Sequence, residues 1–154
     1  MTLRLTRQAI SEIKAHGRET YPHECCGALV GTLEETGRKI VHEVVRLPNS
    51  YTTEVAVDLG ILENERGTLN RYIIDPKDLY QTEKEARAQG WSIVGFYHSH
   101  PDHPAVPSKY DLGVASSGYS YVIVSVPQGI PAELRSWQTD APREEFLPEV
   151  VEEA

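Results

Sequence analysis

The chain has 154 residues, of which 40% are hydrophobic and 25% are charged, and these values suit one globular domain. Its formal net charge of −8 argues against a nucleic-acid partner, because a nucleic-acid surface is normally a basic patch. The first residues form no signal peptide, and no stretch approaches the ~20 apolar residues needed to span a bilayer. We therefore expect a cytoplasmic protein without a membrane partner.

The amino-terminal part predicts a strand, a helix and a hairpin. Residues 2–5 have the pattern of a short strand. Residues 6–16 place apolar side chains at helical spacing, with Thr6 as the N-cap and Gly17 as the stop. The two apolar runs within residues 25–45 flank the polar turn TLEETG, which predicts a hairpin.

The remaining elements alternate between helices and strands. Residues 48–70 mix turn signals with a short apolar run, and we expect a substrate-contacting loop there. Asp75 and Pro76 open a helix that ends before Gly90. Beyond it, the patterns predict a strand over 91–97, a helix over 108–117, and strands over 119–126 and 132–139. The order β-α-β-β-α-β-α-β-β predicts an α/β or α+β fold, with a mixed β-sheet flanked by helices.

The carboxyl-terminal residues differ in composition from the rest of the chain. From Asp140 to Ala154, six acidic residues stand against one basic residue, which is typical of a solvated terminus. Four apolar residues within it indicate that a short piece packs on the domain. We therefore predict one domain over residues 1–138 and an acidic tail over 139–154, partly packed or flexible.

Residues 98–111, HSHPDHPAVPSKYD, carry the most chemical information. Strand residues i and i+2 point to one face, so His98 and His100 could offer both imidazoles to one ion. Asp111 would return from the next element as a third, anionic ligand. Three nitrogen or oxygen ligands with one open position are typical of a catalytic zinc site, whereas structural sites usually have four ligands and are rich in cysteine. The stretch therefore predicts metal-assisted hydrolysis.

The spacing of Ser108 and Asp111 has a second interpretation. Ser-x-x-Asp after a proline is typical of a helix N-cap with an acid in the first turn. A capped helix would also hold Asp111 rigidly beside the histidines. The spacing alone does not decide whether Asp111 is a metal ligand or part of a helix cap.

A hydrolytic zinc site also needs a base that accepts a proton from water. The best candidate is Glu24, in the turn-strand segment that begins at Tyr21. The competing interpretation is an exposed acid at a strand edge. The chain has no HExxH helix, which excludes the thermolysin-like arrangement, and no paired P-C-x-x-C cysteines of the zinc deaminases.

The other histidines and the two cysteines have simpler interpretations. We expect His23 and His103 to be exposed loop residues, His42 to be structural, and His16 to lie at a helix end where positive charge is favourable. The cysteines, Cys25 and Cys26, are adjacent. A disulfide between neighbours would close almost no loop, so we expect reduced, buried thiols, with a metal, redox or nucleophilic role as the alternative.

The combined motif resembles the JAMM (MPN+) metallopeptidases, and the resemblance covers about residues 2–138. It is carried by Pro22-x-Glu24-x-x-Gly27-x-Leu29-x-Gly31, then His98-Ser99-His100-Pro101, six residues, and Ser108-x-x-Asp111. The chain is most similar to compact prokaryotic members that begin with an ECCG-type strand. Those members cut after the carboxyl-terminal Gly-Gly of ubiquitin-like sulfur-carrier proteins.

The resemblance implies a role for each motif residue. His98, His100 and Asp111 would bind one Zn²⁺, Glu24 would be the general base and then the general acid, and Ser108 would stabilise the oxyanion. It also implies an MPN/JAMM-like fold with a cytidine-deaminase-like arrangement, a ubiquitin-like partner ending in Gly-Gly, and a possible homodimer. Only about eight residues separate Asp111 from the next strand, where the eukaryotic deubiquitinases of the family carry a longer insertion, so a dedicated polyubiquitin-chain enzyme is disfavoured.

Three alternatives stay open beside this zinc isopeptidase. One is a non-catalytic scaffold, although scaffold relatives typically lose the ligands that are present here. Another is a metal-dependent hydrolase acting on a different amide, such as a peptidoglycan fragment. The last is a cysteine hydrolase that uses Cys25 or Cys26, although no histidine-acid pair is evident beside them.

Overall fold

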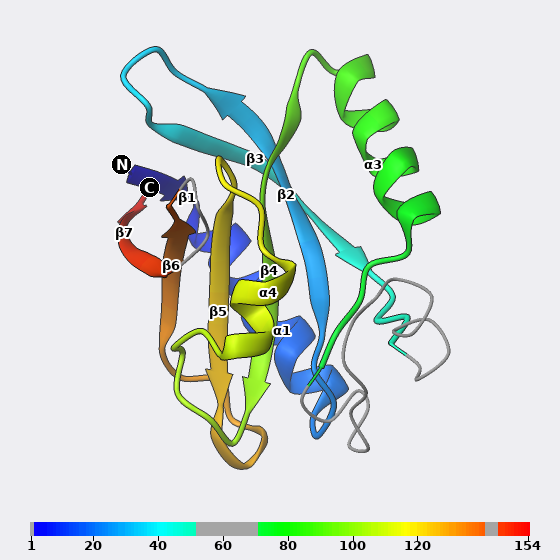
Figure 1. The fold of residues 1–154 in the computed structure, drawn as a ribbon, viewed down its shortest axis with the longest axis vertical. Coiled ribbons are helices and arrows are strands. Elements are labelled where there is room, and N and C mark those ends of the chain that lie inside the picture. Colours follow the sequence, from blue (N-terminus) through cyan, green and yellow to red (C-terminus); the bar gives the residue numbers. More distant parts are fainter. Residues whose placement is uncertain (1, 52–70, 141–144) are drawn as a thin grey trace.

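The computed structural model describes residues 2–51, 71–140 and 145–154. Within these residues, a mixed sheet closes into a barrel in the order β1-β3-β2-β4-β5-β6-β7, with β1 bonded to both β3 and β7 (Figure 1). Three of the strand pairs are parallel (β1–β3, β1–β7 and β4–β5), and the other four are antiparallel. The strands are β1 Thr2–Leu5, β2 Cys26–Leu33, β3 Lys39–Leu47, β4 Ser92–Pro101, β5 Ser120–Val126, β6 Leu134–Thr139 and β7 Phe146–Glu153.

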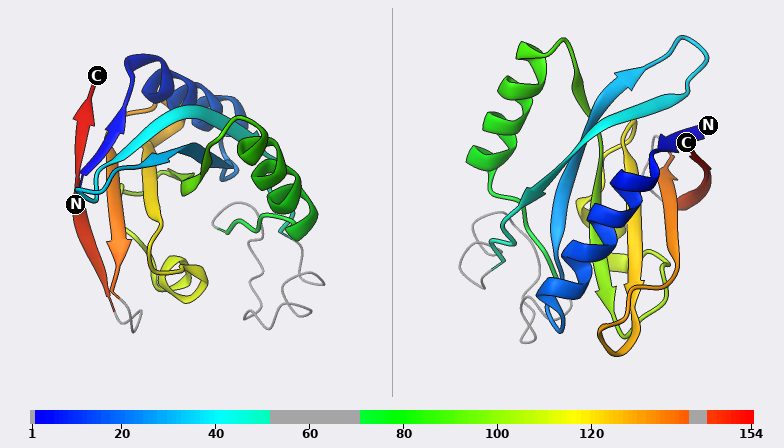
Figure 2. Two further views of the ribbon diagram at one scale, coloured as in Figure 1. Left: turned by 90° about the horizontal axis from the view of Figure 1, so that it is seen from above. Right: turned by 180° about the vertical axis from the view of Figure 1, so that it is seen from behind.

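Helices lie on both faces of the sheet. α1 crosses one face and α4 lies against the opposite one, while α3 flanks the β2–β4 side (Figures 1 and 2). The core forms between α1 and the sheet, where Ile13 packs with valines of β5 and with Tyr97 of β4. The helices are α1 Arg7–Thr20, α3 Pro76–Ala88 and α4 Lys109–Val114, and a short 3-10 helix, η2, spans Pro127–Gly129.

Most predicted elements are confirmed, but the predicted end of the first helix is wrong. Thr6 is its N-cap, as predicted, yet the helix continues through Gly17 to Thr20. Gly17 packs against the sheet, where a Cβ atom would lie 3.0 Å from Val126 Cγ2 and 3.4 Å from Ser99 Cβ. The glycine therefore allows helix and sheet to approach closely, and it does not stop the helix.

The expectation for His16 is wrong for the same reason. One turn before the true helix end, His16 is buried, and its Nδ1 lies 2.7 Å from the Tyr97 hydroxyl. Burial, with a smaller contribution from Arg46, lowers the pKa of His16 to about 4. The side chain is therefore neutral at pH 7, and its role is packing and hydrogen bonding inside the core.

The acidic tail contributes a strand to the sheet. β7 pairs with β1 in parallel, placing Leu3 opposite Val151, and with β6 in antiparallel, placing Ser136 opposite Glu149. Glu152 forms ion pairs with Arg4 and Arg38. The barrel is thus closed by residues beyond 138. The mixed sheet with flanking helices agrees with the predicted α/β class, whereas the cytidine-deaminase-like arrangement stays a prediction.

No helix among the described residues is both long and apolar enough to cross a membrane.

Candidate metal centre

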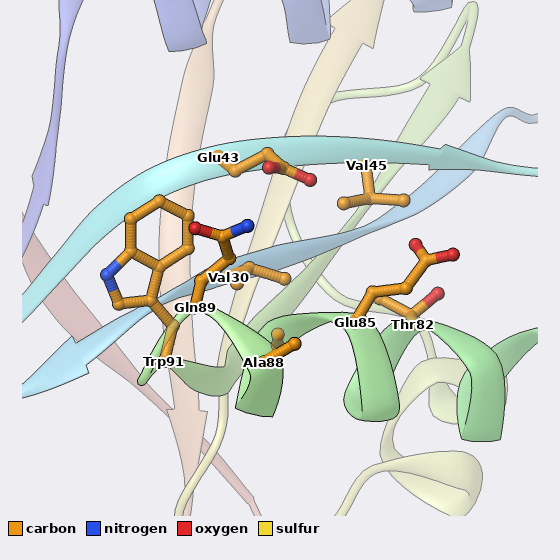
Figure 3. Close-up of a pocket in the computed structure, with 9 residues that line it drawn as sticks. Val30, Glu43, Val45, Thr82, Glu85, Ala88, Gln89 and Trp91 are labelled. Carbon is orange, nitrogen blue, oxygen red and sulfur yellow. The ribbon is translucent and has the colours of Figure 1, made fainter.

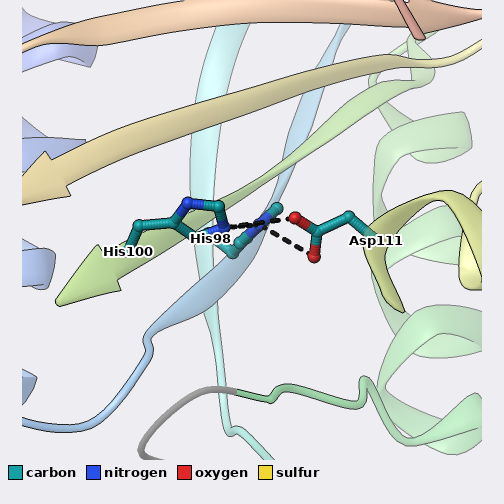
Figure 4. Close-up of side chains that lie close together, drawn as sticks. All are labelled: His98, His100 and Asp111. Atoms are coloured by element: carbon teal, nitrogen blue, oxygen red, sulfur yellow. Dashed lines mark hydrogen bonds and ion pairs between the residues drawn. The ribbon is translucent and has the colours of Figure 1, made fainter. Parts of the chain in front are cut away.

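Two elements bring the predicted ligands together. His98 and His100 lie near the carboxyl end of β4, where residues two apart share a face of the sheet. Asp111 is the third residue of α4, whose N-cap is Ser108. Figure 4 shows the two imidazoles and the carboxylate pointing at one another from these two elements. All three side chains are buried, and no other group of three potential ligands occurs in the described part of the chain.

The spacing of the ligand atoms fits a tetrahedral ion. His98 Nε2 lies 3.1 Å from His100 Nε2 and 3.3 Å from Asp111 Oδ1, and His100 Nε2 lies 3.1 Å from Asp111 Oδ2. Ligands placed ~2.0–2.1 Å from zinc at tetrahedral angles are about 3.3 Å apart. The two imidazole nitrogens and the two oxygens of the Asp111 carboxylate therefore lie at the spacing that ligands of one such ion have.

The protonation of these groups also favours a cation between them. His100 Nδ1 donates a hydrogen bond to the Pro104 carbonyl at 2.9 Å, which leaves Nε2 of a neutral ring with its lone pair. Burial lowers the pKa of His98, and Asp111 opposes that shift only in part. Burial alone would raise the pKa of Asp111, but the two histidines hold it well below its ordinary value. Electron-pair donors and an ionised carboxylate thus face one point.

Strand pairing brings Glu24 to the same place. β2 pairs with β4 so that Cys26 lies opposite His98, and the alternation of side chains puts Glu24 on the face of the two ligands. Glu24 is buried, and its Oε1 has no hydrogen-bond partner among the described residues. Burial and the charge of Asp111 raise the pKa of Glu24 well above its ordinary value, while Arg71 acts in the opposite direction. The interpretation of Glu24 as an exposed strand-edge acid is wrong.

Ser108 caps α4 and keeps its hydroxyl accessible. Its Oγ accepts a hydrogen bond from Asp111 N at 3.1 Å, and its own backbone N–H donates to Asp111 Oδ2 at 2.8 Å. Asp111 Oδ1 takes no part in this capping box and faces His98. The carboxylate can therefore cap the helix through Oδ2 and still offer Oδ1 to an ion. The Ser108 side chain is exposed, and its O–H remains able to donate.

The other histidines and the cysteines lie outside the ligand group. His23 and His103 are exposed, and His42 stacks on Trp91 with ring centroids 5.0 Å apart. Both cysteines are free and buried. Burial raises the pKa of Cys25 to about 11 and raises that of Cys26 further. Both are therefore neutral thiols at pH 7, as expected for buried cysteines.

The sequence did not predict that two tyrosines, Tyr72 and Tyr110, lie beside the candidate metal centre. Tyr72 stacks on His98 with ring centroids 4.4 Å apart, and the Tyr110 hydroxyl donates to the Tyr72 carbonyl at 2.8 Å. Both tyrosines also line a hollow of about 450 Å³, together with Phe96 and Tyr121. The only signal in the sequence is the apolar run before the cap of α3, and nothing in that run points to His98.

A second hollow, of about 300 Å³, lies between α3 and the β2–β3 hairpin (Figure 3). Val30, Glu43, Glu85 and Trp91 are among its lining residues. None of the predicted catalytic or metal-binding residues lines it, so it is separate from the metal centre.

Comparisons with known proteins agree on one family. The family described as prokaryotic homologs of the JAB domain matches residues 6–140. A Thermus thermophilus protein named "Probable TtuB-protein conjugate cleaving protease" is 30% identical, covering 80% of this chain and 70% of its own length. A Haloferax volcanii protein named "Desampylase" is 32% identical, covering 82% of both chains.

Solved structures add agreement in fold. A protein from Salinibacter ruber has a TM-score of 0.71 at 35% identity, over 100% of this chain and 92% of its own. A JAB1/MPN domain protein from Archaeoglobus fulgidus has a TM-score of 0.53 at 16% identity, over 99% of both chains. At that identity the second likeness concerns the fold alone.

Proposed function

The chain belongs to the family of prokaryotic homologs of the JAB domain, as its motif predicted, and from this premise we propose that it is a zinc-dependent isopeptidase. Its substrate would be a conjugate in which the carboxyl-terminal Gly-Gly of a ubiquitin-like sulfur-carrier protein is joined to an amine. The observation that carries the proposal is the convergence of His98, His100 and Asp111 within 4.8 Å of one another beside the buried Glu24. The names of the two relatives support a protein conjugate as the substrate.

The donor set fits zinc, since two imidazole nitrogens and one carboxylate oxygen leave a fourth tetrahedral position open. Zinc held by these residues would supply Lewis acidity, polarising the scissile carbonyl and lowering the pKa of water. The buried carboxylate of Asp111 would keep the site close to charge balance with a divalent ion.

Glu24 would move the proton. Its buried carboxyl has a raised pKa, which suits a group that takes a proton from water and returns it to the leaving amine near neutral pH. The unpartnered Oε1 is free to accept that proton. Binding of a cation beside Asp111 would lower the pKa of Glu24 again, toward the value that a base needs.

Ser108 would stabilise the oxyanion. Its Oγ already accepts from Asp111 N, so the orientation of the oxygen is fixed while the hydroxyl hydrogen can point to a developing negative charge. The exposed position of this side chain at the start of α4 suits contact with the substrate.

The aromatic hollow supports an extended peptide as the ligand. It shares Tyr72 with the surroundings of His98, so a tail lying in it would lead directly to the ligands. The substrate-contacting loop predicted within residues 48–70 falls for the most part, at 52–70, outside the described residues.

The cysteine-hydrolase alternative is disfavoured, because Cys25 and Cys26 are buried thiols with raised pKa values, and a nucleophilic cysteine needs an accessible thiolate. A pure scaffold would not need a buried group of three potential ligands beside a buried carboxyl whose Oε1 has no hydrogen-bond partner among the described residues.

The test uses a sulfur-carrier protein whose carboxyl-terminal Gly-Gly is joined through an isopeptide bond to a labelled lysine peptide. Zinc-loaded protein should release the peptide, and intact mass spectrometry should place the cut after the second glycine. Removing the metal with a chelator should stop the reaction, and zinc should restore it. Scission elsewhere, or full activity in the chelator, contradicts the proposal.

A further inference from the structure

We propose that Asn49 and Ser99 are positioning residues that clamp the peptide unit between Glu24 and Cys25 and thereby aim the Glu24 carboxyl at the metal centre. This inference rests on the proposed function, because it assigns the orientation of the general base to two side chains outside the catalytic set. Neither residue is expected to touch the substrate or the ion.

The clamp holds both polar groups of one peptide unit. Asn49 Nδ2 donates to the Glu24 carbonyl at 3.0 Å, and Cys25 N donates to Ser99 Oγ at 2.8 Å. Ser99 N in turn donates to the Cys25 carbonyl at 3.2 Å. Because a peptide unit is planar, fixing its oxygen and its N–H also fixes the Cα atom of Glu24, the point from which its side chain leaves the backbone.

Ser99 ties this peptide unit directly to the ligand strand. It lies between His98 and His100 in β4, and its side chain points to the opposite face, where it is fully buried. Its hydroxyl therefore contacts the backbone next to Glu24 without entering the metal centre.

Asn49 extends the clamp to a third segment. Its Nδ2 also donates to the Arg71 carbonyl at 2.9 Å, and its Oδ1 accepts from Tyr51 N and Ile73 N, each at 3.1 Å. One amide thus makes four hydrogen bonds and joins the segment before β2, the segment after β3 and residues 71–73. The last of these includes Tyr72, which stacks on His98.

The backbone at Glu24 is the part of this residue whose hydrogen bonds the structure shows. Its Oε1 has no hydrogen-bond partner among the described residues, so side-chain bonding at that oxygen does not set its direction. Catalytic groups lose rate when displaced by about 1 Å, on the order of 100-fold in unfavourable cases. A loosened Glu24–Cys25 peptide should therefore slow the chemical step and leave the affinity for zinc intact.

The first test compares Asn49→Ala, Asn49→Asp and Ser99→Ala with the wild type. Asn49→Asp is the sharper change, because a carboxylate still accepts from Tyr51 N and Ile73 N but cannot donate to the Glu24 carbonyl. We expect kcat on the labelled sulfur-carrier isopeptide to fall ~10–100-fold in each variant, with KM within about 3-fold and zinc stoichiometry unchanged. Wild-type kcat in folded Asn49→Asp overturns the proposal.

Matched controls separate positioning from loss of stability. Ser136→Ala removes another buried serine hydroxyl, which donates to Glu149 Oε1 at 2.7 Å, and Gln81→Ala removes an exposed amide that donates to Glu85 on α3. Both should keep the wild-type kcat, and Ser136→Ala should lower the melting temperature about as much as Ser99→Ala does. A kcat loss in Ser136→Ala as large as in Ser99→Ala contradicts a positioning role.

A double-mutant cycle with Glu24→Gln gives the decisive readout. If the clamp acts through Glu24, Asn49→Asp should lower the residual rate of Glu24→Gln by less than about 2-fold, far less than it lowers the wild-type rate. Additive losses overturn the inference while leaving the proposed function intact. A fully active Glu24→Gln enzyme instead contradicts the proposed function itself, so the two failures are distinguishable.

Discussion

Two groups of buried polar side chains in this barrel differ in whether the group contains a cation that can balance its carboxylates. The first is the metal-site group, His98, His100, Asp111 and Glu24. In the second, which we term the closure group, Lys39 donates to Ser120 Oγ at 2.9 Å and Ser136 donates to Glu149 Oε1 at 2.7 Å. These four residues come from β3, β5, β6 and β7.

The closure group contains its own cation. Burial lowers the pKa of Lys39, and attraction to Glu149 opposes the shift, so the ammonium and the carboxylate support each other. Glu149 Oε2 has no hydrogen-bond partner among the described residues, but its charge is compensated. The metal-site group instead has two carboxyl groups, Asp111 and Glu24, and no lysine or arginine among its members, while Asp111 faces the two imidazoles. Burial of charged side chains therefore does not by itself indicate a functional site, whereas burial of carboxyl groups without a cation in the same group does.

The largest expected effect comes from Glu24→Gln. The amide cannot take a proton from water or return one to the amine, so kcat should fall ~10⁴-fold, the upper end for a general acid-base residue. Zinc stoichiometry should stay at the wild-type value, because Glu24 is not among the ligands. Isopeptide turnover and metal analysis on the same preparation check both expectations. Retained turnover, or loss of zinc, would place Glu24 in a different role.

Lys39→Met should lower the stability of the protein and leave its kcat unchanged, the opposite of what we expect for Glu24→Gln. Removing the cation breaks its hydrogen bond to Ser120 and leaves the buried Glu149 carboxyl without the charge that attracts it, and loss of a charged hydrogen bond destabilises by about 1.5–3 kcal/mol. Urea denaturation should show this loss, while kcat and zinc affinity of the folded protein stay at the wild-type values. The double variant Lys39→Met with Glu149→Leu should recover much of the stability. A change in kcat would mean that the two groups are coupled.

Ser108→Ala tests a residue with an observed structural role, the helix cap, and a proposed chemical role. Loss of an oxyanion donor lowers kcat ~10²–10³-fold, and loss of an N-cap costs about 1 kcal/mol of stability. Ser108→Thr keeps the hydroxyl and should keep most of both. If Ser108→Ala loses stability with less than a 10-fold fall in kcat, then Ser108 is a helix cap only.

The contrast also explains which parts of the molecule were predictable from the sequence. His98, His100 and Asp111 follow from local rules, since strand alternation and helix capping act over a few residues. The approach of Glu24 depends on the pairing of Cys26 with His98, seventy-two positions apart (98 − 26 = 72), which no local pattern encodes.

The same limit applies to barrel closure and to Asn49. An acidic tail has the composition of a solvated end, and its pairing with β1 joins segments that are far apart in the sequence, which also places Glu152 beside Arg4 and Arg38. Asn49 follows a proline in a segment with ordinary turn signals, and three of its four hydrogen bonds, to Glu24, Arg71 and Ile73, involve residues that are distant in sequence. Barrel closure and the hydrogen bonds of Asn49 thus both depend on contacts between segments that are far apart in the sequence.

His16 belongs to neither group and gives the smallest expected effect. It is a single buried titratable side chain, and its hydrogen-bond partner, the Tyr97 hydroxyl, is uncharged. Its folded pKa of about 4 lies below the unfolded value of 6.5, so the unfolded chain binds a proton first as the pH falls. The stabilisation is complete above about pH 6.5 and is lost between pH 6.5 and 4, by about 3 kcal/mol at most. Urea denaturation of metal-free protein at pH 7.5 and 4.5 should show this loss, and His16→Gln should flatten it. An equal pH slope in both proteins would mean that burial in this barrel does not by itself hold the His16 imidazole neutral.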